Sequence, residues 1–115
     1  MLKTYVIDID GTICTSGNNY KQSIPRYDRI KKINQLYDEG HTIKYLTARG
    51  MGRYKDSGMM AHKEFYDLTY NQLLSWGCKF HHLIMGKPAG DIYIDDKGIN
   101  DDDFFNQICT QGMGI

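Results

Sequence analysis

Asp8 and Asp10 are separated by one residue and follow a short apolar run, Tyr5 to Ile7. The run is typical of a buried parallel strand, because it is short and rich in β-branched residues. Asp10-Gly11 indicates that the strand ends there. Carboxylates at the carboxyl end of a strand lie where open α/β sheets bind ligands. Such oxygen ligands suit a divalent cation such as Mg²⁺, while an ordinary acidic turn is the alternative interpretation of this short pattern.

Three further polar features fall at or near the ends of later apolar runs: Thr47, Lys87 and the pair Asp95-Asp96. Each alone has an ordinary explanation as a cap or a turn. Together with Asp8 they supply a carboxylate nucleophile, a hydroxyl donor, an ammonium group and further acids. Phosphoryl transfer to an enzyme aspartate needs that set of groups. The combination therefore predicts a phosphate site.

These residues need a frame that brings strand ends together, and the sequence alternates strand and helix patterns. Apolar residues recur at helical spacing after Pro25, which suits the first position of a helix, and Gly40 ends the pattern. The expected helices cover 25–40, 60–76 and a short stretch from 101, and the expected strands cover 5–7, 41–47, 81–85 and 91–94. Residues 14–23 are expected to form a flap, and residues 50–60 a loop. This order predicts an α/β fold: a three-layer, Rossmann-like, mostly parallel sheet with helices on both faces, in one domain over residues 1–115.

The composition disfavours several classes of function. The chain has 14 Lys or Arg and 14 Asp or Glu residues, so no net basic field draws nucleic acid non-specifically. No apolar run approaches the roughly 20 residues that span a bilayer, and the first residues do not resemble a signal peptide. Cys14, Cys78 and Cys109 show no C-x-x-C spacing, which favours reduced thiols. We therefore expect a cytoplasmic protein that has no membrane segment.

Asp101, Asp102 and Asp103 form an acidic run after Asn100. Such a run resembles a metal site, but acids in the first turn of a helix also complement the helix dipole. Because asparagine is a good helix N-cap, we expect the run to begin the final helix and not to bind a metal.

The order and identity of these features resemble the haloacid dehalogenase (HAD) superfamily of phosphohydrolases. The first motif of that superfamily, D-x-D-G-T, is matched without departure by residues 8–12. Its second motif, a Thr or Ser that ends the next strand, corresponds to Thr47. Its third and fourth motifs correspond to Lys87 and to Asp95-Asp96. The resemblance covers nearly the whole chain.

The resemblance implies an Mg²⁺-dependent phosphomonoester hydrolase. By that resemblance Asp8 attacks phosphorus and becomes an aspartyl-phosphate, while Asp10 protonates the leaving oxygen and then activates water. Thr47 and Lys87 would hold the phosphoryl oxygens. The implied substrate-binding residues are Gly11, Thr12, Ala48 and Arg49. The implied Mg²⁺ ligands are Asp8, the backbone carbonyl of Asp10, and one or both of Asp95 and Asp96.

Many members of the superfamily carry a cap domain over the site, but the two usual insertion points hold only short segments here, 14–23 and 50–79. The chain therefore resembles a capless member. Water must then be excluded by the substrate, by the loop at 50–60 or by a neighbouring subunit, so a homo-oligomer is compatible with the sequence. Arg49 lies beside the expected site and could grip a second anionic or sugar group, with a solvated arginine as the alternative.

A narrower resemblance, carried by T-A-R-G, L-L-x-W-G, G-K-P and Y-I-D-D-K, is to small bacterial or phage phosphatases associated with capsule and surface-sugar biosynthesis. The expected substrate is therefore a small phosphorylated metabolite, such as a sugar phosphate or a nucleotide. A polynucleotide-end phosphatase is the alternative within the superfamily, which the lack of a basic stripe disfavours. A receiver-type signalling domain is a weaker alternative, because its acidic pair and its phospho-accepting aspartate come in a different order.

Overall fold

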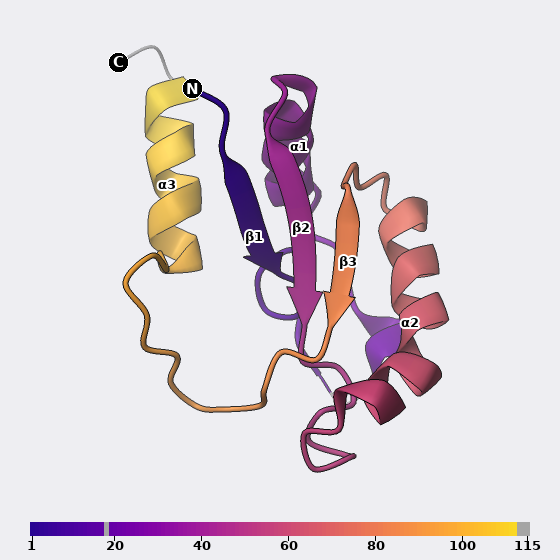
Figure 1. Ribbon diagram of the computed structural model, residues 1–115. Coiled ribbons are helices and arrows are strands. Elements are labelled where there is room, and N and C mark those ends of the chain that lie inside the picture. The colour runs from indigo at the N-terminus through magenta and orange to yellow at the C-terminus, as the bar shows by residue number, and fades with distance from the viewer. Residues whose placement is uncertain (18, 113–115) are drawn as a thin grey trace.

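The structure, a computed structural model, is an α/β fold with a three-stranded parallel sheet (Figure 1). It describes residues 1–17 and 19–112, with side chains as far as Asn106. The strands are β1 (Thr4–Asp8), β2 (Thr42–Thr47) and β3 (His82–Met85), in the order β1-β2-β3. The helices are α1 (Tyr27–Asp38), α2 (Gly58–Ser75) and α3 (Asp101–Gly112), with a short 3₁₀ helix η1 (Tyr20–Gln22). The first three expected strands and the three expected helices are therefore confirmed.

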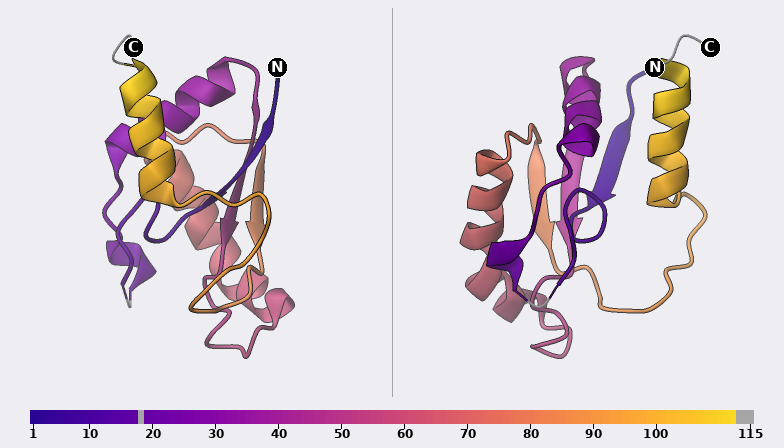
Figure 2. Two further views of the ribbon diagram at one scale, coloured as in Figure 1. Left: turned by 90° about the vertical axis from the view of Figure 1, so that its left-hand side faces the viewer. Right: turned by 180° about the vertical axis from the view of Figure 1, so that it is seen from behind.

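In the side view of Figure 2, α1 and α3 lie on one side of the sheet. The chain steps in one direction, from β1 to β2 to β3. Because right-handed crossovers that step in the same direction put their helices on the same face, α1 and α2 share a face. The expected third layer is therefore not observed among the described elements.

The core forms between the sheet and these helices. In β2, residues 43, 45 and 47 point inward and are fully buried, as the two-residue period of a strand requires. The buried apolar cluster joins β1, the turn after it, α1, β2, α2 and α3, and it includes Ile7, Ile9, Ile13, Ile30, Ile33, Ile43, Tyr45, Leu73 and Phe105. On the opposite face Val6 is 58% exposed and Ile84 is 39% exposed. That face of the sheet is therefore apolar in part and uncovered.

The expected fourth strand over residues 91–94 is wrong. The connection between β3 and α3 runs outward from the carboxyl ends of the strands before it returns to α3 (Figure 1). Ile92 is 79% exposed and Ile94 is 93% exposed on this connection. Only residues 86–90 separate β3 from Asp91, whereas a parallel crossover takes about a dozen residues or more. We call residues 88–99 the arm.

Local signals set the ends of the helices. Ser57 caps α2 by accepting a hydrogen bond from the backbone N–H of Met60, so this helix begins two residues before the expected start. Gly40 and Gly77 have positive φ angles just after α1 and α2, which is the conformation expected of a residue that ends a helix.

The sequence also predicted that the chain has no membrane segment and that its cysteines are reduced. No helix of the described residues is long and apolar enough to cross a bilayer. Cys14 and Cys78 are free and buried, and the side chain of Cys109 lies outside the described part of the chain.

Arg29 joins α1 to α3 and to the turn after β1. Its guanidinium donates to Asp101 at 2.6 Å, to Asp102 at 2.7 Å and to the backbone carbonyl of Thr12 at 3.1 Å. It also lies 4.6 Å from the centre of the Phe105 ring. The acidic run at 101–103 therefore serves the packing of α3, through an ion pair as well as through the helix dipole.

We predict that Arg29→Gln lowers the free energy of unfolding by about 2 kcal/mol, because it removes charge-assisted hydrogen bonds from a side chain that is only 11% exposed. Chemical denaturation measures this change. The matched control is Arg53→Gln, which removes an ion pair to Glu64 from an arginine that is 62% exposed. It should cost less than about 0.5 kcal/mol. Equal losses in the two variants would contradict the role given to Arg29.

The contribution of Arg29 should also depend on pH. Burial alone would raise the pKa of Asp101, but the hydrogen bond and charge of Arg29 lower that pKa below its ordinary value. A carboxyl whose pKa is lowered by folding stabilises the protein fully above its unfolded pKa, and this stabilisation is lost as the pH falls through the folded pKa. The difference between wild type and Arg29→Gln should therefore shrink below about pH 4.

Candidate functional site

The carboxyl ends of the three strands bring three of the predicted site residues together. Asp8 is the last residue of β1, Thr47 is the last residue of β2, and Lys87 follows β3 by two residues. The backbone N–H of Lys87 donates to the carbonyl of Thr47 at 3.1 Å. Asp10 lies in the turn directly after β1, so it belongs to the same end of the sheet.

Asp8 and Lys87 form the part of the site that solvent reaches. Lys87 Nζ lies 3.3 Å from Asp8 Oδ1, and the two side chains are 20% and 33% exposed. Burial raises the pKa of Asp8; Lys87 opposes this rise and Asp10 adds to it, so the pKa lies above its ordinary value. The result is a carboxylate that solvent reaches, beside an ammonium group.

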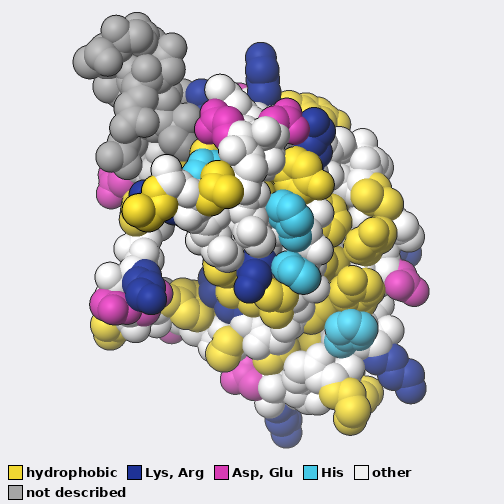
Figure 3. Space-filling model, turned by 45° about the horizontal axis from the view of Figure 1, so that its top comes forward, with side chains coloured by type: hydrophobic (Ala, Val, Ile, Leu, Met, Phe, Trp, Pro, Cys, Tyr) yellow, Lys and Arg dark blue, Asp and Glu magenta, His cyan; other side chains and the backbone are white. Residues whose placement is uncertain are grey.

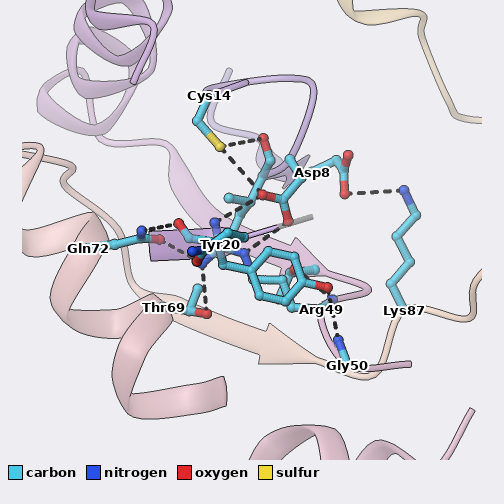
Figure 4. Close-up of polar contacts among 12 residues, drawn as sticks. Asp8, Cys14, Tyr20, Arg49, Gly50, Thr69, Gln72 and Lys87 are labelled. Atoms are coloured by element: carbon cyan, nitrogen blue, oxygen red, sulfur yellow. Dashed lines mark hydrogen bonds and ion pairs between the residues drawn. The ribbon is translucent and has the colours of Figure 1, made fainter. Parts of the chain in front are cut away.

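Figure 4 shows Asp8 and Lys87 directed toward one another, whereas Asp10 pairs with Arg49. Arg49 Nε donates to Asp10 Oδ2, and Nη2 donates to Asp10 Oδ1, each at 2.9 Å. This two-pronged ion pair fixes the plane of the Asp10 carboxylate. Arg49 itself is 1% exposed.

The remaining donors of Arg49 also point into the protein. Nη1 donates to Thr69 Oγ1 at 3.1 Å and to Gln72 Oε1 at 2.6 Å, both on α2. The guanidinium lies 4.7 Å from the centre of the Tyr20 ring, and Gln72 Nε2 donates to the carbonyl of Tyr20 at 2.5 Å. Arg49 therefore ties together the turn after β1, the flap and α2.

The sequence predicted that Arg49 contacts substrate, whereas the structure directs this side chain into the protein. Four of the five N–H donors of this buried guanidinium bond to Asp10, Thr69 and Gln72, so the side chain is directed into the protein and away from solvent. We therefore treat Arg49 as a positioning residue, which holds Asp10 and the flap.

Other predicted phosphate contacts are engaged within the protein. The backbone N–H of Gly11 donates to the carbonyl of Cys14 at 2.9 Å, and that of Thr12 donates to the carbonyl of Ile9 at 3.1 Å. Thr47 is fully buried, and its Oγ1 accepts from the backbone N–H of Arg49 at 3.0 Å. The carbonyl of Ala48 accepts from the N–H of Met51 at 2.9 Å. These groups shape the turns at the site.

Three residues of the site were missed by the sequence reasoning: Tyr20, Thr69 and Gln72. Cys14 follows D-x-D-G-T closely enough to be expected near the site, although without a role in the chemistry. Cys14 Sγ donates to Asp10 Oδ1 at 3.6 Å, and burial, followed by the charge of Asp10, raises the pKa of this thiol to about 11. Thr69 and Gln72 offered a signal, because they are polar residues three apart on a helix and Thr69 falls in its apolar stripe.

Asp95 and Asp96 do not join the site within one chain. Both are exposed on the arm, and Asp95 Oδ1 accepts from the backbone N–H groups of Lys97 and Gly98 at 2.5 and 3.2 Å. Among the described residues no three acidic, histidine or cysteine side chains are gathered in a way that could hold a metal ion. One chain therefore places Asp8 and Asp10 at the expected Mg²⁺ site and leaves Asp95 and Asp96 outside it.

Comparison with known proteins shows the fold of this chain. No family model and no curated protein matches the sequence. The crystal structure of a target protein from Vibrio cholerae is similar, with a TM-score of 0.82 and 22% sequence identity. The match covers 96% of this chain and 99% of that one. The TM-score shows that the two chains share a fold, and at this sequence identity the likeness extends to the fold alone.

We predict that Asp8 titrates above its ordinary pKa of about 3.9, because burial is the largest influence on it. NMR titration of the aspartate carboxyl carbons measures this value. Lys87→Met should move the pKa of Asp8 further up, since the lysine charge is what opposes burial. The matched control, Lys31→Met, changes an exposed lysine on α1 and should leave the pKa of Asp8 unchanged. A lower pKa in Lys87→Met would contradict the geometry.

We predict that Arg49→Lys lowers the free energy of unfolding by about 3 kcal/mol, because lysine cannot make the two-pronged pair to Asp10 and cannot also replace the guanidinium donors to Thr69 and Gln72. Urea denaturation measures the change. Arg53→Lys, at an exposed arginine, is the matched control and should stay within about 0.5 kcal/mol of wild type. Similar behaviour of the two variants would show that the Arg49 network does not hold the fold.

Proposed function

We propose that the protein is a HAD-type phosphomonoester hydrolase that works through an aspartyl-phosphate on Asp8. The observation that carries this proposal is the half-buried, solvent-reachable carboxylate of Asp8, 3.3 Å from the ammonium group of Lys87. Both lie at the carboxyl ends of parallel strands, where α/β sheets bind ligands. The match of residues 8–12 to D-x-D-G-T supports the same reading.

The chemistry divides between a few side chains. One carboxylate oxygen of Asp8 forms a bond to phosphorus while the bond from phosphorus to the leaving oxygen breaks, and water later cleaves the aspartyl-phosphate to release phosphate. Lys87 offsets charge on Asp8 and on the phosphoryl oxygens. Asp10 is the proposed acid and base, and Arg49 positions its carboxylate.

Charge explains why a further cation belongs to the proposal. Two unit negative charges about 4 Å apart repel by roughly 4 kcal/mol at an effective dielectric near 20. A phosphate dianion beside Asp8 and Asp10 makes several such pairs, and Lys87 offsets one charge. We propose Mg²⁺ as the cofactor, because carboxylate oxygens are the ligands it prefers. When bound, it would neutralise charge on the phosphoryl group.

The proposed substrate is a small phosphorylated metabolite, such as a sugar phosphate or a nucleotide. The site is open, because Asp8 and Lys87 are both partly exposed. The chain carries equal numbers of basic and acidic residues, so no net field selects a polyanion. The substrate must therefore be recognised by local contacts.

We predict that the protein releases phosphate from members of a panel of phosphorylated metabolites when Mg²⁺ is present. Asp8→Asn should reduce the rate at least about 1,000-fold, because the nucleophile is lost, and excess EDTA should abolish turnover. A colorimetric phosphate assay measures each rate. Asp67→Asn changes an exposed aspartate on α2 and is the matched control, with an unchanged rate.

Two outcomes would overturn the proposal. Asp8→Asn with wild-type activity would show that Asp8 is not the nucleophile. Stable labelling of Asp8 by a small phosphodonor, without release from any compound, would favour a phospho-accepting signalling domain instead.

A further inference from the structure

The arm, residues 88–99, exposes more apolar surface than a loop of a monomer ordinarily does. Ile92, Ile94 and Ile99 are 79%, 93% and 63% exposed, and Tyr93 is 53% exposed. Residues 92–94 are β-branched or aromatic, which is typical of a strand. The space-filling view shows an opening between the body of the molecule and the segment that leaves it (Figure 3). The arm is thus a segment of strand-forming composition whose isoleucines have no cover among the described residues.

The edge of β1 offers the surface that such a segment needs. The strand order leaves β1 paired on one side, with β2. A free edge presents backbone N–H and C=O groups to which another strand can bond. Val6 on β1 is 58% exposed and Leu2 just before it is 67% exposed. The described chain therefore has both an open edge and an uncovered apolar strand segment.

The arm does not pair with β1 of its own chain as a parallel strand. Residues 86–90 are too few for the crossover that this pairing requires. The start of the arm is also held at the carboxyl end of the sheet, because the backbone N–H of Ala89 donates to Asp56 Oδ1, in the loop between β2 and α2, at 3.1 Å. Within the arm, Tyr93 Oη donates to the carbonyl of Pro88 at 2.6 Å, and Lys87 Nζ lies 4.2 Å from the centre of the Tyr93 ring. A parallel strand beside β1 would have to begin at the opposite end of the sheet.

We infer that the arm of a second copy of this chain pairs with β1 and brings Asp95 and Asp96 of the partner subunit to Asp8. Each copy carries one arm and one edge, so a two-fold dimer uses both twice. The arm and the five residues of β1, with the uncovered sheet face, approach the roughly 20 to 30 residues per side of a standard interface. A net charge of zero adds no repulsion between copies.

This inference rests on the proposed function for its chemical meaning. In a parallel pairing, Asp95 of the partner subunit ends its strand as Asp8 ends β1, and neighbouring strands lie about 4.8 Å apart. The carboxylates that one chain keeps apart would then meet between two chains. The missing Mg²⁺ ligands and the uncovered arm thus have one explanation.

The first test measures the oligomeric state of the full chain by light scattering after size exclusion. We expect a dimer for wild type and a monomer for Ile94→Lys. Ile94 is 93% exposed, so the substitution does not disturb the fold, which circular dichroism checks. Leu74→Lys, at a leucine on α2 that is 53% exposed, is the control and should remain a dimer. A monomeric wild type, or dimeric Ile94→Lys, would overturn the inference.

The second test uses two inactive variants, Asp8→Asn and the double variant Asp95→Asn, Asp96→Asn. When the two variants are refolded together in equal amounts, half of the dimers contain one chain of each kind. In each mixed dimer, Asp8 of the double variant and the partner's Asp95 and Asp96 form one complete site, while the other site lacks all three carboxylates. The mixture should therefore recover about one quarter of the wild-type rate. An inactive mixture, beside an active wild type, would overturn the sharing of sites between chains.

The two tests separate this inference from the proposed function. A wild type that releases no phosphate but dimerises through Ile94 would overturn the proposed function and leave the interface standing. An active monomer would overturn the inference and leave the proposed function standing.

Discussion

The buried guanidinium of Arg49 is the interaction on which the rest of the site depends. A charge that is 1% exposed is costly unless every donor finds an acceptor. Here the acceptors come from the turn after β1, through Asp10, and from α2, through Thr69 and Gln72. These elements can settle only in the arrangement that satisfies Arg49. The same arrangement orients the turn that follows Asp8.

The direction of the crossovers is the second constraint. Because β1, β2 and β3 follow one another in the sheet, the crossover helices gather on one face, and β1 is left as an edge. A chain that returned to β1 through a long connection would cover both the edge and the open face. The connection after β3 has only residues 86–90 before the apolar segment. The uncovered edge and the exposed arm therefore have the same origin.

These two constraints explain how much could be predicted from the sequence. The meeting of Asp8, Thr47 and Lys87 follows from strand patterns alone, because parallel strands end at one edge. The role of Arg49 could not be predicted, since its partners lie 20 to 39 residues away in the chain. The strand expected at 91–94 failed because local β-propensity carries no information about the connection that must place the strand. The expected third layer is not observed among the described elements because the crossovers from β1 to β2 to β3 step in one direction, which local patterns do not reveal.

The electrostatics of Asp8 connect the chemistry of the site to the way in which copies assemble. Burial disfavours the ionised form of Asp8 and raises its pKa, and the charge of Lys87 opposes this rise. A phosphate group adds negative charge at the same place, so the proposed reaction needs a second source of positive charge. The carboxylates that could hold a divalent cation stand on a segment whose apolar side chains have no cover in one chain. Burying those side chains against the edge of a second copy would stabilise the dimer and complete the site in a single step. In that arrangement the hydrophobic effect, acting on Ile92 and Ile94, would bring together charges that repel one another without a metal ion.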